Sequence, residues 1–144
     1  MLPHNVFGCD IETVPDVEGG RRLLDLQDLS DADAGRAMLA LRRQQTGGEF
    51  LKLHLHRIVT ISIAARLGGR FRVWSLAEPE CSEPEIISRF FEGIERFTPT
   101  LVTWNGCAFD LPVLHYRALI HGVTAARYWE NGSNDQSFRW NNYL

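Results

Sequence analysis

The sequence contains few cysteines and no long apolar run. Its three cysteines, Cys9, Cys81 and Cys107, are an odd number without a Cys-x-x-Cys pair, which argues against a disulfide framework and against a zinc site. No stretch reaches the roughly 20 apolar residues of a membrane span, and the N-terminus lacks the basic and apolar regions of a signal peptide. We therefore expect no membrane association and a cytoplasmic location.

The chain also lacks an excess of positive charge. Its formal net charge of -3 provides no overall attraction to nucleic acid, so binding of that kind requires a local basic patch or a bound metal. The 144 residues, 44% of them hydrophobic and 23% charged, are typical of one globular domain with a substantial core. Charge alone neither excludes nor establishes a nucleic-acid role.

Apolar periodicity predicts an α/β order of elements. A first strand ends at Pro15, and a polar helical insertion follows over about residues 17–50. Within the insertion we expect a short helix over 23–29 and a longer helix that begins after Ser30 and is closed by Gly47.

A β-hairpin comes after the insertion, with Gly68-Gly69 in its tight turn. We expect Val59, Ile61 and Ile63 on one face of this hairpin. The last stretch, 128–144, has no clear period. The remaining predicted elements are a helix from Ser82 to before Pro99, a buried strand over 100–104, and a helix over 111–121 ended by Gly122.

Two carboxylates stand side by side at the end of the first strand, in the stretch CDIETVPD. Asp10 and Glu12 point to the same side of an extended strand, roughly 7 Å apart along the chain. Two like charges at the mouth of a core are costly unless a positive charge lies between them. A divalent cation is the obvious candidate.

A third carboxylate follows the strand over 100–104. If that strand lies parallel to the first, Asp110 emerges beside Asp10 and Glu12 at the carboxyl edge of the sheet. Oxygen ligands of this kind favour magnesium or manganese. Two such ions about 4 Å apart activate water and stabilise a leaving oxygen in phosphodiester cleavage.

Four stretches resemble one known family: DIETVPD, HRIVTISIA, LVTWNGCAFDLPVLHYRALIHG and RWNNYL. They are similar to the predicted 3′-to-5′ exonucleases related to the proofreading domain of family B DNA polymerases, in the DEDD superfamily. The resemblance implies an α/β fold, a ribonuclease-H-like mixed β-sheet flanked by helices. It also implies that Asp10 and Glu12 are metal ligands and that Asp110 contributes to the same metal centre.

The family also has a third motif on a later helix, with a Tyr or His and a final metal-binding Asp. The sequence up to Leu144 contains no such motif, and Asp135 has no Tyr or His three or four residues ahead of it. We therefore expect a single exonuclease-like domain over 1–144 that is a fragment lacking its C-terminal part; the alternatives are that the missing carboxylate is supplied otherwise or that this version is inactive.

Further residues near the motifs have two interpretations each. The resemblance suggests that Phe109 contacts a terminal base, although an aromatic at a helix start is often part of a core. Thr13 either contacts the 3′ end or caps the strand. Asn105 is a substrate-binding candidate within a tight turn, in which Gly106 is expected to allow an unusual backbone angle.

Several histidines and aromatics lie outside the motifs, and each has more than one interpretation. His54 and His56 have the spacing of ligands on one strand face, but a solvated strand entry explains them as well. The aromatic and basic residues of the last stretch fit either nucleic-acid contact or docking onto a later helix. These residues are Tyr128, Trp129, Arg139 and Trp140.

The leading hypothesis is a metal-dependent 3′-to-5′ exonuclease that uses two Mg²⁺ or Mn²⁺ ions at single-stranded 3′ ends, with DNA ahead of RNA. The alternative is a catalytically inactive nucleic-acid-binding or scaffold module with the same fold. A third hypothesis is a hydrolase of small phosphorylated molecules that uses the same acidic cluster.

Overall fold

The protein is built on a four-stranded mixed sheet, seen here in a computed structural model that describes residues 5–130. The strand order is β3-β2-β1-β4. β1 pairs antiparallel with β2, β2 pairs antiparallel with β3, and β4 runs parallel to β1. The strands are β1 (Asn5–Pro15), β2 (His56–Leu67), β3 (Arg70–Ser75) and β4 (Thr100–Val102).

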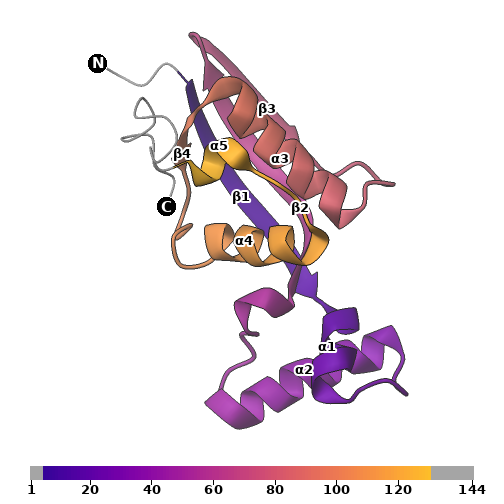
Figure 1. Cartoon of the computed structure of the whole chain (residues 1–144). Helices are drawn as coiled ribbons and strands as arrows, with labels where there is room; N and C mark the ends of the chain where they lie inside the picture. Colours follow the sequence, from indigo (N-terminus) through magenta and orange to yellow (C-terminus); the bar gives the residue numbers. More distant parts are fainter. Residues whose placement is uncertain (1–4, 131–144) are drawn as a thin grey trace.

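Three helices cover one face of this sheet, and two more lie beyond the end of β1 (Figure 1). The covering helices are α3 (Glu83–Phe97), α4 (Asp110–His121) and α5 (Ala126–Trp129). The insertion contains α1 (Val17–Leu24), α2 (Asp31–Thr46) and the 3₁₀ turn η1 (Leu53–Leu55). The predicted α/β class is confirmed.

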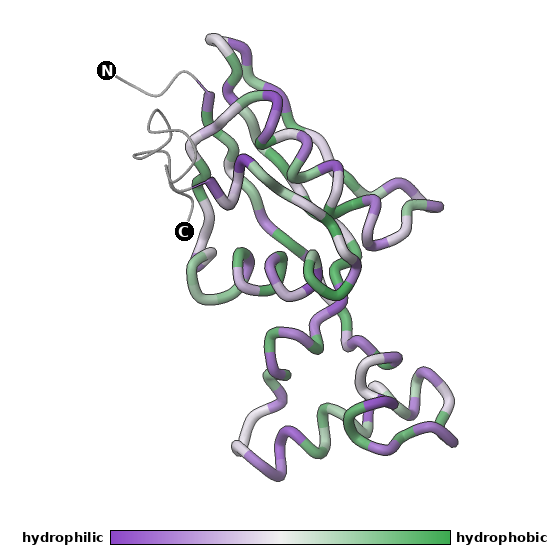
Figure 2. Tube along the Cα trace, in the orientation of Figure 1, coloured by the Kyte–Doolittle hydropathy of each residue, from purple (hydrophilic) through white to green (hydrophobic). Residues whose placement is uncertain are grey.

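The main core lies between the sheet and these covering helices. Alternate residues of β1, Phe7, Cys9 and Ile11, are buried against them, and Phe90 and Ile94 of α3 are fully buried in the same cluster. Figure 2 shows apolar segments along the central strands. The insertion has a smaller cluster of its own, formed by Met38, Leu51 and Leu55.

The helix ends follow the signals in the sequence. The Ser30 side chain accepts a hydrogen bond at the start of α2, and a capping box joins Ser82 to Glu85 at the start of α3. Gly47 and Gly122 end α2 and α4 in the left-handed conformation. The predictions for these three helices are confirmed, whereas β4 is shorter than predicted and α5 was not predicted.

The first helix of the insertion differs from the prediction over 23–29, which was wrong. Asp16 caps the helix, since its Oδ1 accepts a hydrogen bond from Gly19 N at 3.1 Å, and α1 therefore begins at Val17. Asp25 then adopts the left-handed conformation with φ 57° and ends α1 after Leu24.

A β-bulge changes the expected face of β2. Glu12 pairs with Thr60 and Thr13 with Ile58, so Val59 is an extra residue on β2. Ile58 is therefore buried together with Ile61 and Ile63, and the prediction that Val59 shares their face was wrong. The bulge lies at the end of β1 that carries the two acidic residues.

No helix within residues 5–130 is long and apolar enough to cross a membrane.

A buried arginine joins the elements around the end of β1. Arg117 on α4 is 2% exposed; its Nη1 donates to Asp16 Oδ2 at 2.5 Å and its Nε donates to Glu83 Oε1 at 2.8 Å. The same Nη1 reaches the carbonyl oxygen of His54 at 3.3 Å. Glu83 in turn accepts a hydrogen bond from Ile58 N at 2.7 Å. One guanidinium on α4 thus connects α3, η1, the residue that follows β1 and caps α1, and, through Glu83, β2.

Hydrogen bonding offsets the burial of this ion cluster. Burial by itself would raise the pKa of Asp16, but the hydrogen bonds from Arg117 and from Gly19 N–H outweigh burial, so the pKa of Asp16 is lowered. Burial would lower the pKa of Arg117, and the carboxylates of Glu83 and Asp16 raise it instead. Asp16 and Arg117 are therefore charged in the folded protein at neutral pH.

We expect Arg117→Met to lower the free energy of unfolding by about 3–5 kcal/mol, because it leaves two buried carboxylates without their partner. Urea denaturation at neutral pH measures the loss. Arg36→Met is the matched control, since Arg36 forms only an exposed ion pair with Asp33 and should change stability little. Equal stability of the two variants would contradict the structural role of Arg117.

Acid should weaken the same cluster. Because the pKa of Asp16 is lowered by folding, its ionised form stabilises the fold at any pH above the ordinary value of 3.8, and this contribution decreases as the pH falls below 3.8 through the folded-state pKa. The difference in unfolding free energy between wild type and Asp16→Asn should therefore be full at neutral pH and shrink in acid. Urea titrations above and below that pH measure it; a constant difference would refute the linkage.

Candidate active site

Asp10 and Glu12 lie on the open face of β1. Both residues are exposed, whereas their neighbours Cys9 and Ile11 are buried against the helices. The predicted alternation is thus confirmed. Asp10 also lines a shallow hollow of about 380 Å³ on the open face of the sheet, with the 92%-exposed Trp104 at its margin.

Asp110 reaches β1 from the start of α4. The parallel pairing of β1 with β4 ends at Gly8 and Val102, and beyond it Asp110 Oδ1 accepts a hydrogen bond from Ile11 N at 3.2 Å. The carboxylate thus satisfies a main-chain N–H of β1 past the end of β4. Asp110 is 3% exposed and comes from 99 residues further along the chain.

The turn before α4 has an unusual backbone angle, but at Asn105 rather than at Gly106. Asn105 has a φ of 60°, a conformation that asparagine tolerates better than most residues. Gly106 is required for a different reason: a Cβ there would lie 1.9 Å from Thr103 Oγ1. The expectation that Gly106 supplies the unusual angle was therefore wrong, and the glycine serves a close approach.

The electrostatics of this edge reflect burial and neighbouring acids. Burial raises the pKa of Asp110 and the charge of Asp10 adds to the rise, although the N–H groups of Asp110 itself and of Ile11 oppose it. Burial, with the charges of Asp110 and Asp10, raises the pKa of Cys9 to about 12. The thiol of Cys9 is therefore protonated at neutral pH, and it is no thiolate ligand or nucleophile.

The chemistry of these groups fits a hard divalent cation. Carboxylate oxygens are the ligands that Mg²⁺ and Mn²⁺ prefer, and the repulsion between Asp10 and Asp110 is one that a cation relieves. Within residues 5–130, neither of them nor Glu12 forms an ion pair. The described side chains also form no group of three or more potential ligands. The structure thus brings Asp10 and Asp110 together, with Glu12 two residues further along β1.

Three aromatic rings pack against one another in a cluster that includes the residue before Asp110. Phe109 precedes Asp110, and its ring centroid lies 5.1 Å from that of His56 and 5.6 Å from that of Phe50. The rings of Phe50 and His56 are 5.2 Å apart. Sequence reasoning missed Phe50, because a single aromatic after a Gly-Gly-Glu loop carries no periodic or motif signal.

His56 is a half-buried hydrogen-bonded residue, which corrects its interpretation as a solvated strand entry. Its Nδ1 lies 3.0 Å from Thr13 Oγ1 and its Nε2 lies 3.3 Å from the carbonyl oxygen of Leu51. Burial lowers the pKa of His56, so the ring is neutral at pH 7. A carbonyl only accepts, so Nε2 donates to Leu51 and Nδ1 accepts from the Thr13 hydroxyl.

The histidines and aromatics around the end of α4 differ in exposure: His121 and Trp129 are exposed, whereas Tyr128 is buried. Tyr128 is 1% exposed and its hydroxyl lies 2.6 Å from His115 Nε2, which assigns it to the core. His121 Nε2 lies 2.7 Å from Glu83 Oε2, at the margin of the Arg117 cluster. The candidates Asp135, Arg139 and Trp140 lie outside the described residues.

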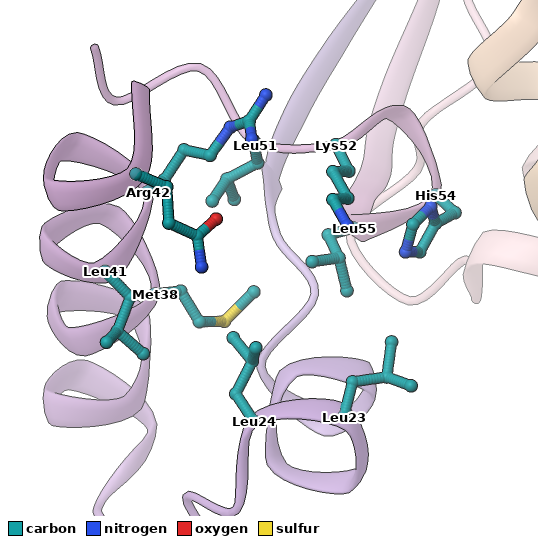
Figure 3. Close-up of a pocket in the computed structure, with 10 residues that line it drawn as sticks. Leu23, Leu24, Met38, Leu41, Arg42, Leu51, Lys52, His54 and Leu55 are labelled. Atoms are coloured by element: carbon teal, nitrogen blue, oxygen red, sulfur yellow. The ribbon is translucent and has the colours of Figure 1, made fainter. Parts of the chain in front are cut away.

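A cavity of about 260 Å³ lies within the insertion, apart from the carboxylates. Its lining is mostly apolar, with side chains from α1, α2 and η1 pointing into it (Figure 3). Met38, Leu51 and Leu55 of the smaller core cluster form part of its wall. We assign no chemistry to this cavity.

A mixed sheet with helices on one face and acidic residues at the carboxyl end of β1 defines an α/β domain of the ribonuclease-H-like exonuclease class. Residues 48–144 match the family described as predicted 3′-5′ exonucleases related to the exonuclease domain of PolB, and the chain belongs to this family. The matched range includes Asp110 and the turn at Asn105. Asp10 and Glu12 lie before it.

A curated relative is the DNA polymerase 1 of Sulfolobus acidocaldarius. It is 27% identical to the chain over 106 residues, which are 74% of this chain and 10% of that polymerase. The chain thus spans about a tenth of the length of this relative.

We expect Gly106→Ala to destabilise the protein by about 1–3 kcal/mol, because the new methyl group would overlap Thr103 in the turn that leads to Asp110. Thermal or urea denaturation measures the change. Gly48→Ala is the matched control, since a Cβ at Gly48 has no neighbour within 4 Å, and it should change stability by less than about 0.5 kcal/mol. A neutral Gly106→Ala variant would show that the turn does not need the glycine.

Proposed function

We propose that this chain is a metal-dependent exonuclease domain that removes nucleotides from single-stranded 3′ ends, DNA ahead of RNA. One observation carries the proposal: Asp110, within the part of the chain that matches the exonuclease family, is hydrogen-bonded to β1 between Asp10 and Glu12. Two distant acidic motifs therefore meet at one edge of the sheet, where ligand sites of α/β proteins lie.

Asp10, Glu12 and Asp110 are the residues that would hold two Mg²⁺ or Mn²⁺ ions. When bound, such ions supply an activated water and stabilise the departing 3′ oxygen in phosphodiester cleavage. Asp110 contributes a buried carboxylate fixed by Ile11 N–H, and Asp10 and Glu12 contribute exposed carboxylates on the open face. A fixed acid beside two accessible ones suits a site that admits a nucleic-acid end.

Substrate contact falls to the residues around this edge. Asn105 is exposed in the turn before α4, and Phe109 stands directly before Asp110. The hydroxyl of Thr13 is hydrogen-bonded to His56, which fixes the position of the Thr13 side chain. Thr13 is the third candidate for contact with the 3′ end. These three residues remain our candidates for holding the terminal nucleotide.

A catalytically inactive nucleic-acid-binding or scaffold module is the second candidate function. It is favoured by the absence of a three-ligand group among the side chains of residues 5–130. Such a module binds single-stranded DNA and cleaves none of it with Mn²⁺ present. Release of phosphate from p-nitrophenyl phosphate, with no degradation of oligonucleotides, would instead favour a hydrolase of small phosphorylated molecules.

We expect Asp10→Asn to weaken Mn²⁺ binding and to reduce cleavage of a 5′-labelled single-stranded oligodeoxynucleotide, each by more than about 100-fold, since loss of an outer-shell partner alone costs up to that amount. Calorimetric titration measures the first effect and gel electrophoresis of the products measures the second. Asp10 is exposed, so its replacement should leave the unfolding transition unchanged.

Asp28→Asn serves as the control, because Asp28 is an exposed acid in the insertion. It should bind Mn²⁺ and cleave as wild type does. Equal Mn²⁺ affinity of wild type and Asp10→Asn would remove Asp10 from the metal site. Cleavage retained by Asp10→Asn would overturn the proposed chemistry.

A further inference from the structure

Phe50 lies on the surface and yet is held in place. The residue is 61% exposed. Its carbonyl oxygen nevertheless accepts a hydrogen bond from Arg42 Nε of α2 at 2.8 Å. The next residue, Leu51, is buried in the small core of the insertion. The main chain is therefore anchored at the Phe50 carbonyl and at Leu51, although the ring of Phe50 is open to solvent.

The ring of Phe50 packs against two other rings. It lies 5.2 Å from His56 and 5.6 Å from Phe109 between centroids, with interplanar angles of 43° and 58°. These distances are within the range of favourable aromatic pairs. A single exposed aromatic needs no explanation, but an exposed ring that packs at a tilt against two half-buried rings presents a supported apolar surface to solvent.

This surface is linked through neighbouring residues of the chain to two of the candidate metal ligands. Phe109 is bonded directly to Asp110, and His56 is hydrogen-bonded to Thr13, the residue after Glu12. A nucleobase stacks on aromatic rings whatever its identity, so such a surface suits an enzyme that removes successive nucleotides without sequence preference. Exposed Lys52 and Arg57 lie within a few residues of Phe50 and His56 in the chain.

We propose that Phe50 is a substrate-positioning residue that stacks on a base at the 3′ end of the bound strand, with His56 and Phe109 beneath it. The helical insertion would then contribute directly to the substrate site, because α2 holds Phe50 through Arg42. This inference rests on the proposed nuclease function. Phe50 is assigned to contact with the base, whereas the carboxylates are assigned to metal binding at the scissile phosphate.

The test measures binding of a 5′-fluorescein single-stranded oligodeoxynucleotide that carries 2-aminopurine at its 3′ end, with EDTA present so that metal-dependent cleavage is suppressed. Phe50→Ala should bind about 5- to 150-fold more weakly than wild type. It should also lose the quenching of 2-aminopurine fluorescence that stacking produces. Phe50→Trp should restore both, and Phe50→Leu, which keeps an apolar side chain without a ring, should restore neither.

Two controls separate stacking from other effects. Phe71→Ala removes an exposed phenylalanine of β3, 72% exposed, and should bind as wild type does. An oligonucleotide with an abasic 3′ end should bind wild type and Phe50→Ala equally. Equal affinity of wild type and Phe50→Ala for the complete oligonucleotide would overturn the inference. So would a loss of affinity in Phe50→Ala that is as large for the abasic oligonucleotide as for the complete one. Failure of wild type to bind the complete oligonucleotide would also overturn it.

Measuring cleavage by the same proteins with Mn²⁺ distinguishes a failure of this inference from a failure of the proposed function. Wild type that cleaves, with Phe50→Ala binding unchanged, refutes the role of Phe50 and leaves the nuclease standing. Wild type that does not cleave, with base-dependent binding lost in Phe50→Ala, supports stacking and refutes the nuclease.

Discussion

The buried guanidinium of Arg117 is the interaction on which the position of the other elements depends. It binds Asp16, which lies 101 residues earlier in the chain, and Glu83, which in turn accepts the N–H of Ile58. Withdrawing ionisable groups from water is expensive, and the cost is offset only when their geometry is good. The cluster therefore allows few alternative placements of α4 against the end of β1.

The candidate site depends on this constraint because α4 carries both Asp110 of the site and Arg117 of the buried cluster. Asp110 is the first residue of α4 and Arg117 lies seven residues further along, about 10 Å along the helix axis. Fixing one end of a short rigid helix fixes the other, and Asp110 is thereby held beside Ile11. Asp16 has a second role, since it also caps α1 and so directs the insertion whose end returns to the site with Phe50.

Much of the local structure was predictable because its causes are local. Serine caps, glycine at helix ends and strand alternation depend on residues a few positions apart, and α2, α3 and the exposure of Asp10 and Glu12 followed them. The start of α1 and the sheet face on which Val59 lies did not follow such local signals. The first depends on a cap by Asp16, and the second on a bulge that only the pairing with β1 defines.

The sequence by itself determined the spacing of Asp10 and Glu12, the turn after β4 and the likeness to an exonuclease family, since each is written in neighbouring residues. Only the tertiary structure decided that Asp110 bonds to Ile11, that the angle needed in the turn is at Asn105, and that Phe50 meets Phe109. Contacts between residues so far apart in the chain leave no periodic pattern. They arise from tertiary packing, which brings residues together that are distant in the chain.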